Sequence, residues 1–149
     1  MPAIRDRLNE DMKTAMRGKS ELRLSTIRMI RSEILYKDKE HGKDITEDDI
    51  LKLLQTMVKK REEAAEQYAK GGRVDLAAKE REEIEIVQNY LPAQIGDDEL
   101  RREVRAAITE TGAASLKEMG KVMALLTKKL AGRAASARIS GVVKEMLAG

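Results

Sequence analysis

The spacing of apolar residues along the chain predicts helices throughout and no strands. Apolar positions recur every three or four residues, which is the period of a helix that turns one face into a core. In the second predicted helix, Leu22, Met29, Ile30 and Ile34 fall at this spacing. Seven helices are predicted, at about residues 4–16, 21–40, 47–69, 74–90, 97–111, 115–130 and 136–147. We therefore expect an all-α fold.

Glycine and proline divide this pattern into two predicted domains. Gly71 and Gly72 end the third helix, because glycine reaches the left-handed conformation at little cost. The fourth helix then returns antiparallel and completes a protruding helical hairpin. Pro92 closes it, because the residue before a proline is pushed out of helical geometry. We expect an N-terminal helical domain over 1–92 and a small three-helix tail domain over 93–149.

Two helix starts carry recognisable capping residues. Thr46 precedes a run of acidic residues and offers its hydroxyl as an N-cap. Ser115 and Glu118 have the spacing of a capping box, in which each side chain satisfies one free amide of the first turn. The sixth helix is therefore predicted to begin at Ser115.

The composition excludes several kinds of chemistry. The chain has no cysteine and a single histidine, His41, so we expect no disulfide, thiol nucleophile, bound metal or other cofactor. No serine has an identifiable base and no glycine-rich phosphate loop occurs, so no catalytic residue is predicted and we expect a protein that is not an enzyme. The longest apolar run, Val122 to Leu126, is too short to cross a bilayer. The N-terminus lacks the apolar stretch of a secretory signal, and we predict a cytoplasmic location.

Positive charge is concentrated near the C-terminus. The net charge is only +3, but residues 117–149 hold seven Lys or Arg against two Asp or Glu. On a helical projection of the sixth helix, three lysines share the side opposite the apolar residues. The predicted phosphate-binding set adds the basic residues that follow them: Lys117, Lys121, Lys128, Lys129, Arg133 and Arg138. Positive side chains on one side of a helix repel one another, and bound phosphates would relieve this repulsion. The alternative is an ordinary solvated helix face.

Weaker candidates and one glycine complete the predicted site. Arg23, Arg28 and Arg31 form a secondary basic set in the N-terminal domain. Gly120 inside a helix costs up to about 1 kcal/mol relative to alanine, and close helix packing is the preferred explanation. The approach of a phosphate to the backbone is the alternative. Three tyrosines are too few for a stacking platform, so a nucleic-acid ligand would be a structured RNA recognised by shape and phosphates.

Three segments of the chain resemble the GatB/YqeY family. The first runs from Leu22-Arg23-Leu24 through Ile30-Arg31-Ser32-Glu33, and is the least specific. The second runs from Lys59-Lys60-Arg61-Glu62 through Gly71-Gly72-Arg73-Val74-Asp75-Leu76-Ala77 to Tyr90-Leu91-Pro92. The third is Met119-Gly120-Lys121-Val122-Met123 followed by Gly132-Arg133-Ala134. The resemblance extends over essentially the whole chain, although lysines common in the family are replaced by Ala131 and Ala137.

This resemblance implies a function in translation. The family's module occurs as a free-standing protein and as the C-terminal part of the B subunit of the tRNA-dependent amidotransferase. In that enzyme the tail contacts tRNA, while the glutaminase and transamidation sites lie elsewhere and are not present here. The resemblance therefore implies a non-catalytic tRNA-binding accessory module. The alternative is a module that docks onto a protein partner in tRNA aminoacylation or amidation. A carbon–nitrogen ligase assignment with glutamine as amide donor would be inherited from the amidotransferase by homology alone, since no catalytic residue is identifiable. No membrane partner is expected.

Overall fold

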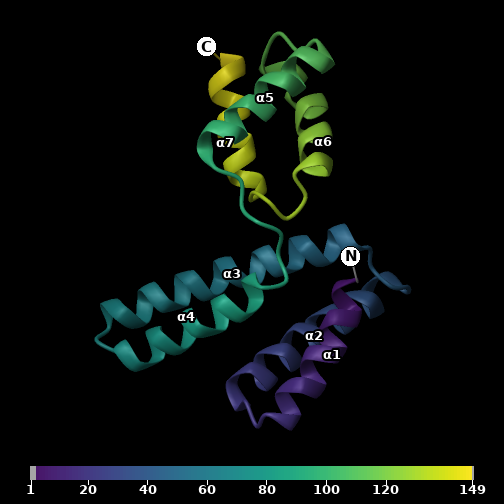
Figure 1. The fold of residues 1–149 in the computed structure, drawn as a ribbon. Helices are drawn as coiled ribbons and strands as arrows, with labels where there is room; N and C mark the ends of the chain where they lie inside the picture. Colours follow the sequence, from purple (N-terminus) through teal and green to yellow (C-terminus); the bar gives the residue numbers. More distant parts are fainter. Residues whose placement is uncertain (1–2, 149) are drawn as a thin grey trace. The chain divides into compact units, whose positions relative to one another are not determined.

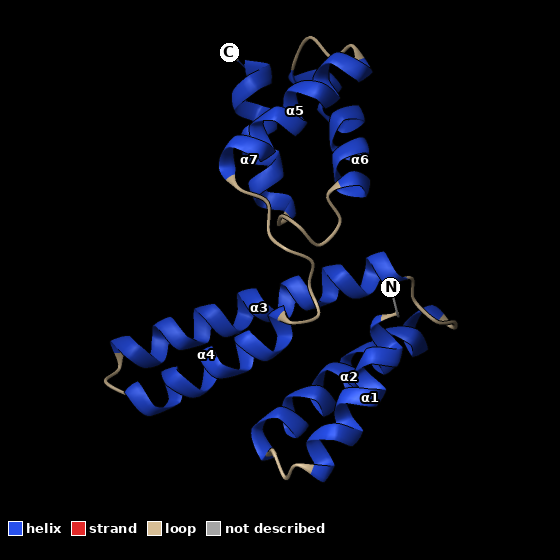
Figure 2. Cartoon of the chain, viewed as in Figure 1, coloured by secondary structure: helices blue, strands red, loops and turns tan. Residues whose placement is uncertain are grey.

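The computed structural model describes residues 3–148, and all regular structure in this range is helical (Figure 1, Figure 2). Within residues 3–148, seven α-helices and one short 3-10 helix, η1, follow one another, which confirms the all-α prediction. The chain packs into two compact units, Met1–Pro92 and Ala93–Gly149. We call them the N-terminal and C-terminal units and describe each by itself. That the two fold as independent domains stays a prediction.

The N-terminal unit consists of two helical hairpins. Its helices are α1 (Ile4–Arg17), α2 (Glu21–His41), α3 (Glu47–Lys70) and α4 (Val74–Gln88). α1 packs along α2 and α3 packs closely along α4, while α2 also packs against α4 (Figure 1). The centre of the core is aliphatic, and its least exposed side chains are Leu8, Ile27, Ile30, Ile50, Leu54 and Val87. Each such side chain stabilises the fold by about 1.5–3 kcal/mol relative to an exposed position.

The two helix ends of the α2–α3 connection follow the sequence signals. α2 ends at Gly42, whose φ of 69° is left-handed and suits glycine. Thr46 caps α3: its hydroxyl accepts from the Asp49 amide at 3.1 Å, and the Asp49 carboxylate accepts from the Thr46 amide at 3.3 Å. These two bonds satisfy amides that the first turn would otherwise leave free. They also lower the pKa of Asp49.

The side of α2 that faces the core is not entirely the side that the apolar pattern predicts. Ile30 and Ile34 are buried as expected, but the core also takes Thr26 and Ile27. Met29 is 41% exposed, so its predicted place in the core is wrong. The rotation is decided by the packing of α2, mainly against α1 and α4, which buries Ile27 fully, whereas Met29 contacts Arg61 of α3. Thr26 tolerates burial because its hydroxyl donates to the Leu22 carbonyl at 2.8 Å.

An ion pair joins α1 to the end of α2. The Arg5 guanidinium donates two hydrogen bonds to the Asp38 carboxylate, at 2.9 and 2.7 Å. Asp38 also accepts from the Ile45 amide at 2.8 Å, which fixes the loop before α3. Arg5, followed by the bond from the Ile45 amide, lowers the pKa of Asp38.

We expect Asp38→Asn to reduce the loss of folding stability that the protein shows as the pH is lowered. Because the folded-state pKa of Asp38 lies below the usual value of about 3.9, its contribution is fully present above about pH 5. It is lost as the pH falls through the folded pKa. The difference in melting temperature between wild type and variant should therefore be largest at pH 7 and shrink toward pH 3. Asp6→Asn, at an exposed position of α1, is the control; an equal effect in both variants would contradict the prediction.

Two further contacts tie α4 into the N-terminal unit. Arg61 of α3 pairs with Glu83 of α4 at 3.0 Å, and the two side chains are only 12% and 10% exposed. The many charged residues of this hairpin suggest pairs exposed on the surface, but this pair is nearly buried. Beyond α4, the Tyr90 hydroxyl donates to Asp11, and the Arg7 guanidinium lies 5.0 Å from the centre of the Tyr90 ring. Burial, together with Asp11, raises the pKa of Tyr90.

The C-terminal unit is a small helical bundle. It comprises α5 (Asp97–Thr111), η1 (Leu116–Glu118), α6 (Met119–Lys129) and α7 (Ser136–Ala148). Each α-helix packs against the other two. Its core contains the fully buried side chains of Leu100, Val104, Val122, Leu126, Leu130, Ile139 and Val143. Gly112 ends α5 with a φ of 70°, as the predicted helix end requires.

The predicted capping box at Ser115 does not form. Ser115 makes no side-chain capping bond, and the Glu118 carboxylate accepts from the Ala114 amide at 3.3 Å instead. A 3-10 turn occupies Leu116–Glu118, and α6 starts only at Met119. The tighter turn rotates these side chains away from the positions of a continuous α-helix. The sixth helix therefore begins later than the sequence predicts.

Candidate nucleic-acid interface

α6 turns one side into the core and the other to solvent. Val122 and Leu126 are fully buried, whereas Lys121 and Lys128 are exposed. These lysines are seven residues apart, which corresponds to about 20° of rotation and about 10 Å of rise. Their side chains therefore leave the same side of the helix, opposite the core.

Lys117 lies immediately before this helix. It belongs to η1 and is exposed, like Lys121 and Lys128. The helical projection that groups the three lysines does not hold across the junction, because η1 has about three residues per turn. The structure therefore places Lys117 next to the start of α6, without fixing it on the same stripe as the other two.

The three lysines have no ion-pair or hydrogen-bond partner among the residues that the structure describes. Most acidic residues of the same unit are already engaged: four lie in ion pairs, namely Asp97, Glu99, Glu103 and Glu145. Glu118 accepts a backbone hydrogen bond. These contacts engage most of the acidic side chains of the unit, so the positive charges of Lys117, Lys121 and Lys128 stay uncompensated. This arrangement favours the binding of an anionic ligand.

The other three residues of the predicted phosphate-binding set form ion pairs within the C-terminal unit. Lys129 Nζ lies 2.8 Å from Glu103, and Arg133 lies 3.4 Å from Glu99. Arg138 lies 2.6 Å from Asp97 and donates to the Ile95 carbonyl at 2.7 Å. These pairs tie α5 and the segment before it to the end of α6 and to α7. Glu103 also raises the pKa of Lys129. A phosphate contact by these three residues stays a prediction, and it would compete with internal partners.

Gly120 does not serve helix packing. It is exposed at the start of α6, and a Cβ placed on it would meet no atom within 4 Å. The preferred explanation from the sequence is therefore wrong. The exposed glycine leaves the backbone of the first turn open beside Lys121, so the approach of a ligand to the backbone remains as the alternative.

Sequence reasoning missed three further cations of the C-terminal unit. Arg102 and Arg105 on α5 and Lys144 on α7 are exposed, and they too have no ion-pair partner in the described part of the chain. The two arginines escape notice because acidic neighbours give their segment a negative net charge. Lys144 belongs to the basic C-terminus but has no role in the predicted set. A search for cations with no acidic residue three or four positions away on the same helix would have found Lys144.

The secondary set lies on α2 of the N-terminal unit. Arg23 and Arg28 are exposed, whereas Arg31 is half-buried and contacts the Met12 sulfur at 2.9 Å. On a helical projection Arg23 and Arg28 are about 140° apart. They do not form one basic stripe, and their role in binding stays a prediction.

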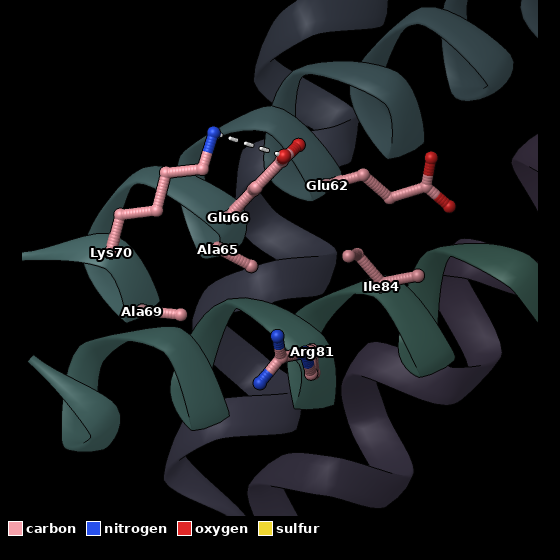
Figure 3. Close-up of a pocket in the computed structure, with 7 residues that line it drawn as sticks. All are labelled: Glu62, Ala65, Glu66, Ala69, Lys70, Arg81 and Ile84. Carbon is pink, nitrogen blue, oxygen red and sulfur yellow. Dashed lines mark ion pairs between the residues drawn. The ribbon is translucent and has the colours of Figure 1, made fainter.

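Within residues 3–148 there is no group of acidic or histidine side chains that could hold a metal ion, and no helix is long and apolar enough to cross a membrane. A cavity of about 390 Å³ lies on the α3–α4 hairpin, with Ala65, Ala69 and Ile84 in its lining (Figure 3). Its rim carries charges of both signs, and Lys70 pairs with Glu66 at 3.3 Å. This mixed rim gives no preference for an anion.

Comparison with known proteins connects the chain to a group of fungal proteins. A protein of Pyrenophora tritici-repentis named "Altered inheritance of mitochondria protein 41, mitochondrial" is 32% identical over 95% of this chain and 79% of its own length. A protein of the same name from Lachancea thermotolerans is 39% identical over 56% of this chain and 46% of its own length. An uncharacterised protein of Schizosaccharomyces pombe is 36% identical over 60% of this chain and 69% of its own length.

These names overturn the predicted cytoplasmic location, because several of the relatives are named as mitochondrial proteins. The prediction rested on the lack of a secretory signal and of a membrane span. Neither feature separates the cytoplasm from a mitochondrial compartment.

The family assignment rests on nearly the whole chain. The sequence matches the family described as "Yqey-like protein" over residues 5–147, which includes both units. The matched range contains the two glycines of the hairpin, Pro92 and the segment around Gly120 on which the resemblance is based. The chain therefore belongs to the YqeY-like protein family.

Proposed function

We propose that the C-terminal unit binds the phosphates of a structured RNA through Lys117, Lys121 and Lys128. The single observation that carries this proposal is that these exposed lysines lack internal partners in the described residues, while most acids of the unit are paired. The family resemblance suggests tRNA as the RNA, and tRNA aminoacylation or amidation as the setting. The chain acts as an accessory binding module in this proposal, and no reacting group is assigned.

Lysines without partners suit phosphate binding for a physical reason. An ammonium group on a flexible stem is a point charge that reaches a phosphate without a fixed geometry. Each neutralised phosphate releases condensed counterions, so affinity falls as salt rises. Exposed Gly120 leaves room for the RNA backbone to approach the first turn of α6.

The test is a titration of labelled bulk tRNA with the purified protein at several salt concentrations. We expect saturable, salt-sensitive binding that an RNA duplex competes for poorly. Replacing Lys117, Lys121 and Lys128 together by glutamine should weaken binding by about tenfold or more. It should also reduce the slope of log affinity against log salt by about 2–3, since each lost phosphate contact removes somewhat less than one unit.

The matched control removes three lysines elsewhere. Lys13, Lys39 and Lys79 are exposed in the N-terminal unit, and their replacement by glutamine changes the net charge equally. If both triple variants lose the same affinity, general charge and not this site drives binding. No saturable binding by the wild-type protein at tens of micromolar would overturn the proposed function itself.

A further inference from the structure

A groove of about 470 Å³ lies between α2 and α3 of the N-terminal unit. The two helices diverge from a short connection and touch each other only slightly, because α2 packs mainly against α1 and α4. The groove follows α3 from Asp49 to Lys60, a length of about 17 Å at the usual helical rise. Three turns of a third helix have the same length.

One wall of the groove presents apolar surface to solvent. Tyr36 lines it and is 62% exposed, whereas tyrosine is usually of intermediate burial. Met29 lies seven residues earlier on the same side of α2, beyond the groove, where its sulfur contacts Arg61 of α3; it is 41% exposed. Leu53 contributes half-buried apolar surface from α3. Apolar side chains on both walls are typical of a surface that packs against a partner.

The charged side chains of the groove favour an acidic occupant. Lys52 and Lys60 line it from α3, and neither has an ion-pair partner in the described part of the chain. Asp49 also lines it, but its carboxylate is engaged in capping α3 with Thr46. Glu33 is the remaining carboxylate of the lining. Lys37 of α2 also lines the groove, but its ammonium group pairs with Glu40 at 3.3 Å. Lys52 and Lys60 are therefore the two cations of the lining that no ion pair of the described residues engages, and they outnumber Glu33, the one lining carboxylate that is not held in the helix cap.

We propose that this groove docks an acidic amphipathic helix of a partner protein. The apolar face of the partner helix packs on Tyr36 and Leu53, and carboxylates on its flank pair with Lys52 and Lys60. This mode of recognition, a helix laid into a groove between helices, matches the length and the apolar walls. A phosphate backbone would satisfy the lysines, but it would leave the apolar surface of Tyr36 and Leu53 uncovered. The proposal concerns the N-terminal unit and does not depend on RNA binding by α6.

The test uses a labelled synthetic helix of about 15 residues with leucines at helical spacing and glutamates on both flanks. We expect saturable binding in fluorescence anisotropy. A matched peptide with lysine in place of each glutamate should bind at least about tenfold more weakly. Tyr36→Ala, and separately Lys52→Glu with Lys60→Glu, should each weaken binding of the acidic peptide about tenfold. All three positions lie outside the buried core, so the variants should keep the wild-type melting temperature.

The control variant combines Arg17→Glu with Lys79→Glu, which changes the net charge by the same amount outside the groove. It should bind the acidic peptide like the wild type. Equal loss in the groove and control variants, or no saturable binding at about 200 μM protein, overturns the proposal. Loss of tRNA binding in the Lys52 and Lys60 variant, without any peptide binding by the wild type, would make the groove an RNA contact and overturn it as well. The α6 variants test RNA binding separately, so the two proposals fail independently.

Discussion

Leu126→Ala is expected to unfold the C-terminal unit at temperatures where the N-terminal unit stays folded. Leu126 is fully buried at the centre of a small core. Truncation of a buried leucine to alanine costs about 2–5 kcal/mol, because apolar contact is lost and a cavity remains. A bundle of this size has a total stability of only about 3–5 kcal/mol, so one such loss removes most of it.

Hydrogen exchange read segment by segment would check this result. In the variant, amides of α5, α6 and α7 should exchange rapidly, while those of α1 to α4 keep their protection. Leu116→Ala is the matched control, since it makes the same chemical change at a side chain that is 49% exposed in the same unit. If both units lose protection together, they fold as one cooperative body and the two-domain prediction is wrong.

Glu83→Ala is expected to destabilise the N-terminal unit by about 3 kcal/mol. The variant leaves the Arg61 guanidinium in a nearly buried position without its carboxylate. Removing one partner of a buried pair is costly because the remaining charge is cut off from water. The loss acts between α3 and α4, so it should appear in the urea unfolding of the helical hairpin.

Two comparisons sharpen this prediction. Glu66→Ala removes an exposed pair with Lys70 on the same hairpin and should cost below about 1 kcal/mol. The double variant Arg61→Met with Glu83→Leu removes both charges and should recover most of the stability lost in Glu83→Ala. If Glu83→Ala costs no more than Glu66→Ala, the pair is open to water and the ion-pair argument fails.

The helical architecture was predictable because its signals are local. Apolar spacing, the Thr46 cap and the glycines at 42, 71, 72 and 112 depend only on residues within a turn or two of one another. The structure confirms the helix ends that they predicted, including the end of α3 at Lys70. The capping box at Ser115 failed although its signal is local, because a 3-10 turn competes with an α-helix over so few residues.

The rotation of a helix was less predictable than its position. Methionine is apolar, so the pattern places Met29 in the core, but α1 and α4 bury the neighbouring side of α2. A glycine is costly in a helix, so Gly120 suggests close packing, yet no neighbour approaches it. Both errors arise because a single helix does not show which side its neighbours cover.

The sequence by itself determined the helices, most of their ends, the family and the basic character of the C-terminal residues, since each depends on residue types and short spacings. Only the tertiary structure decided which of the basic residues are free. Arg138 and Asp97 are 41 positions apart, and the packing of α5 against α7 brings them to 2.6 Å. Lys121 and Lys128 look the same in the sequence but pair with no acidic residue between positions 3 and 148. Whether a charge is neutralised depends on distances across the fold, which composition does not reveal.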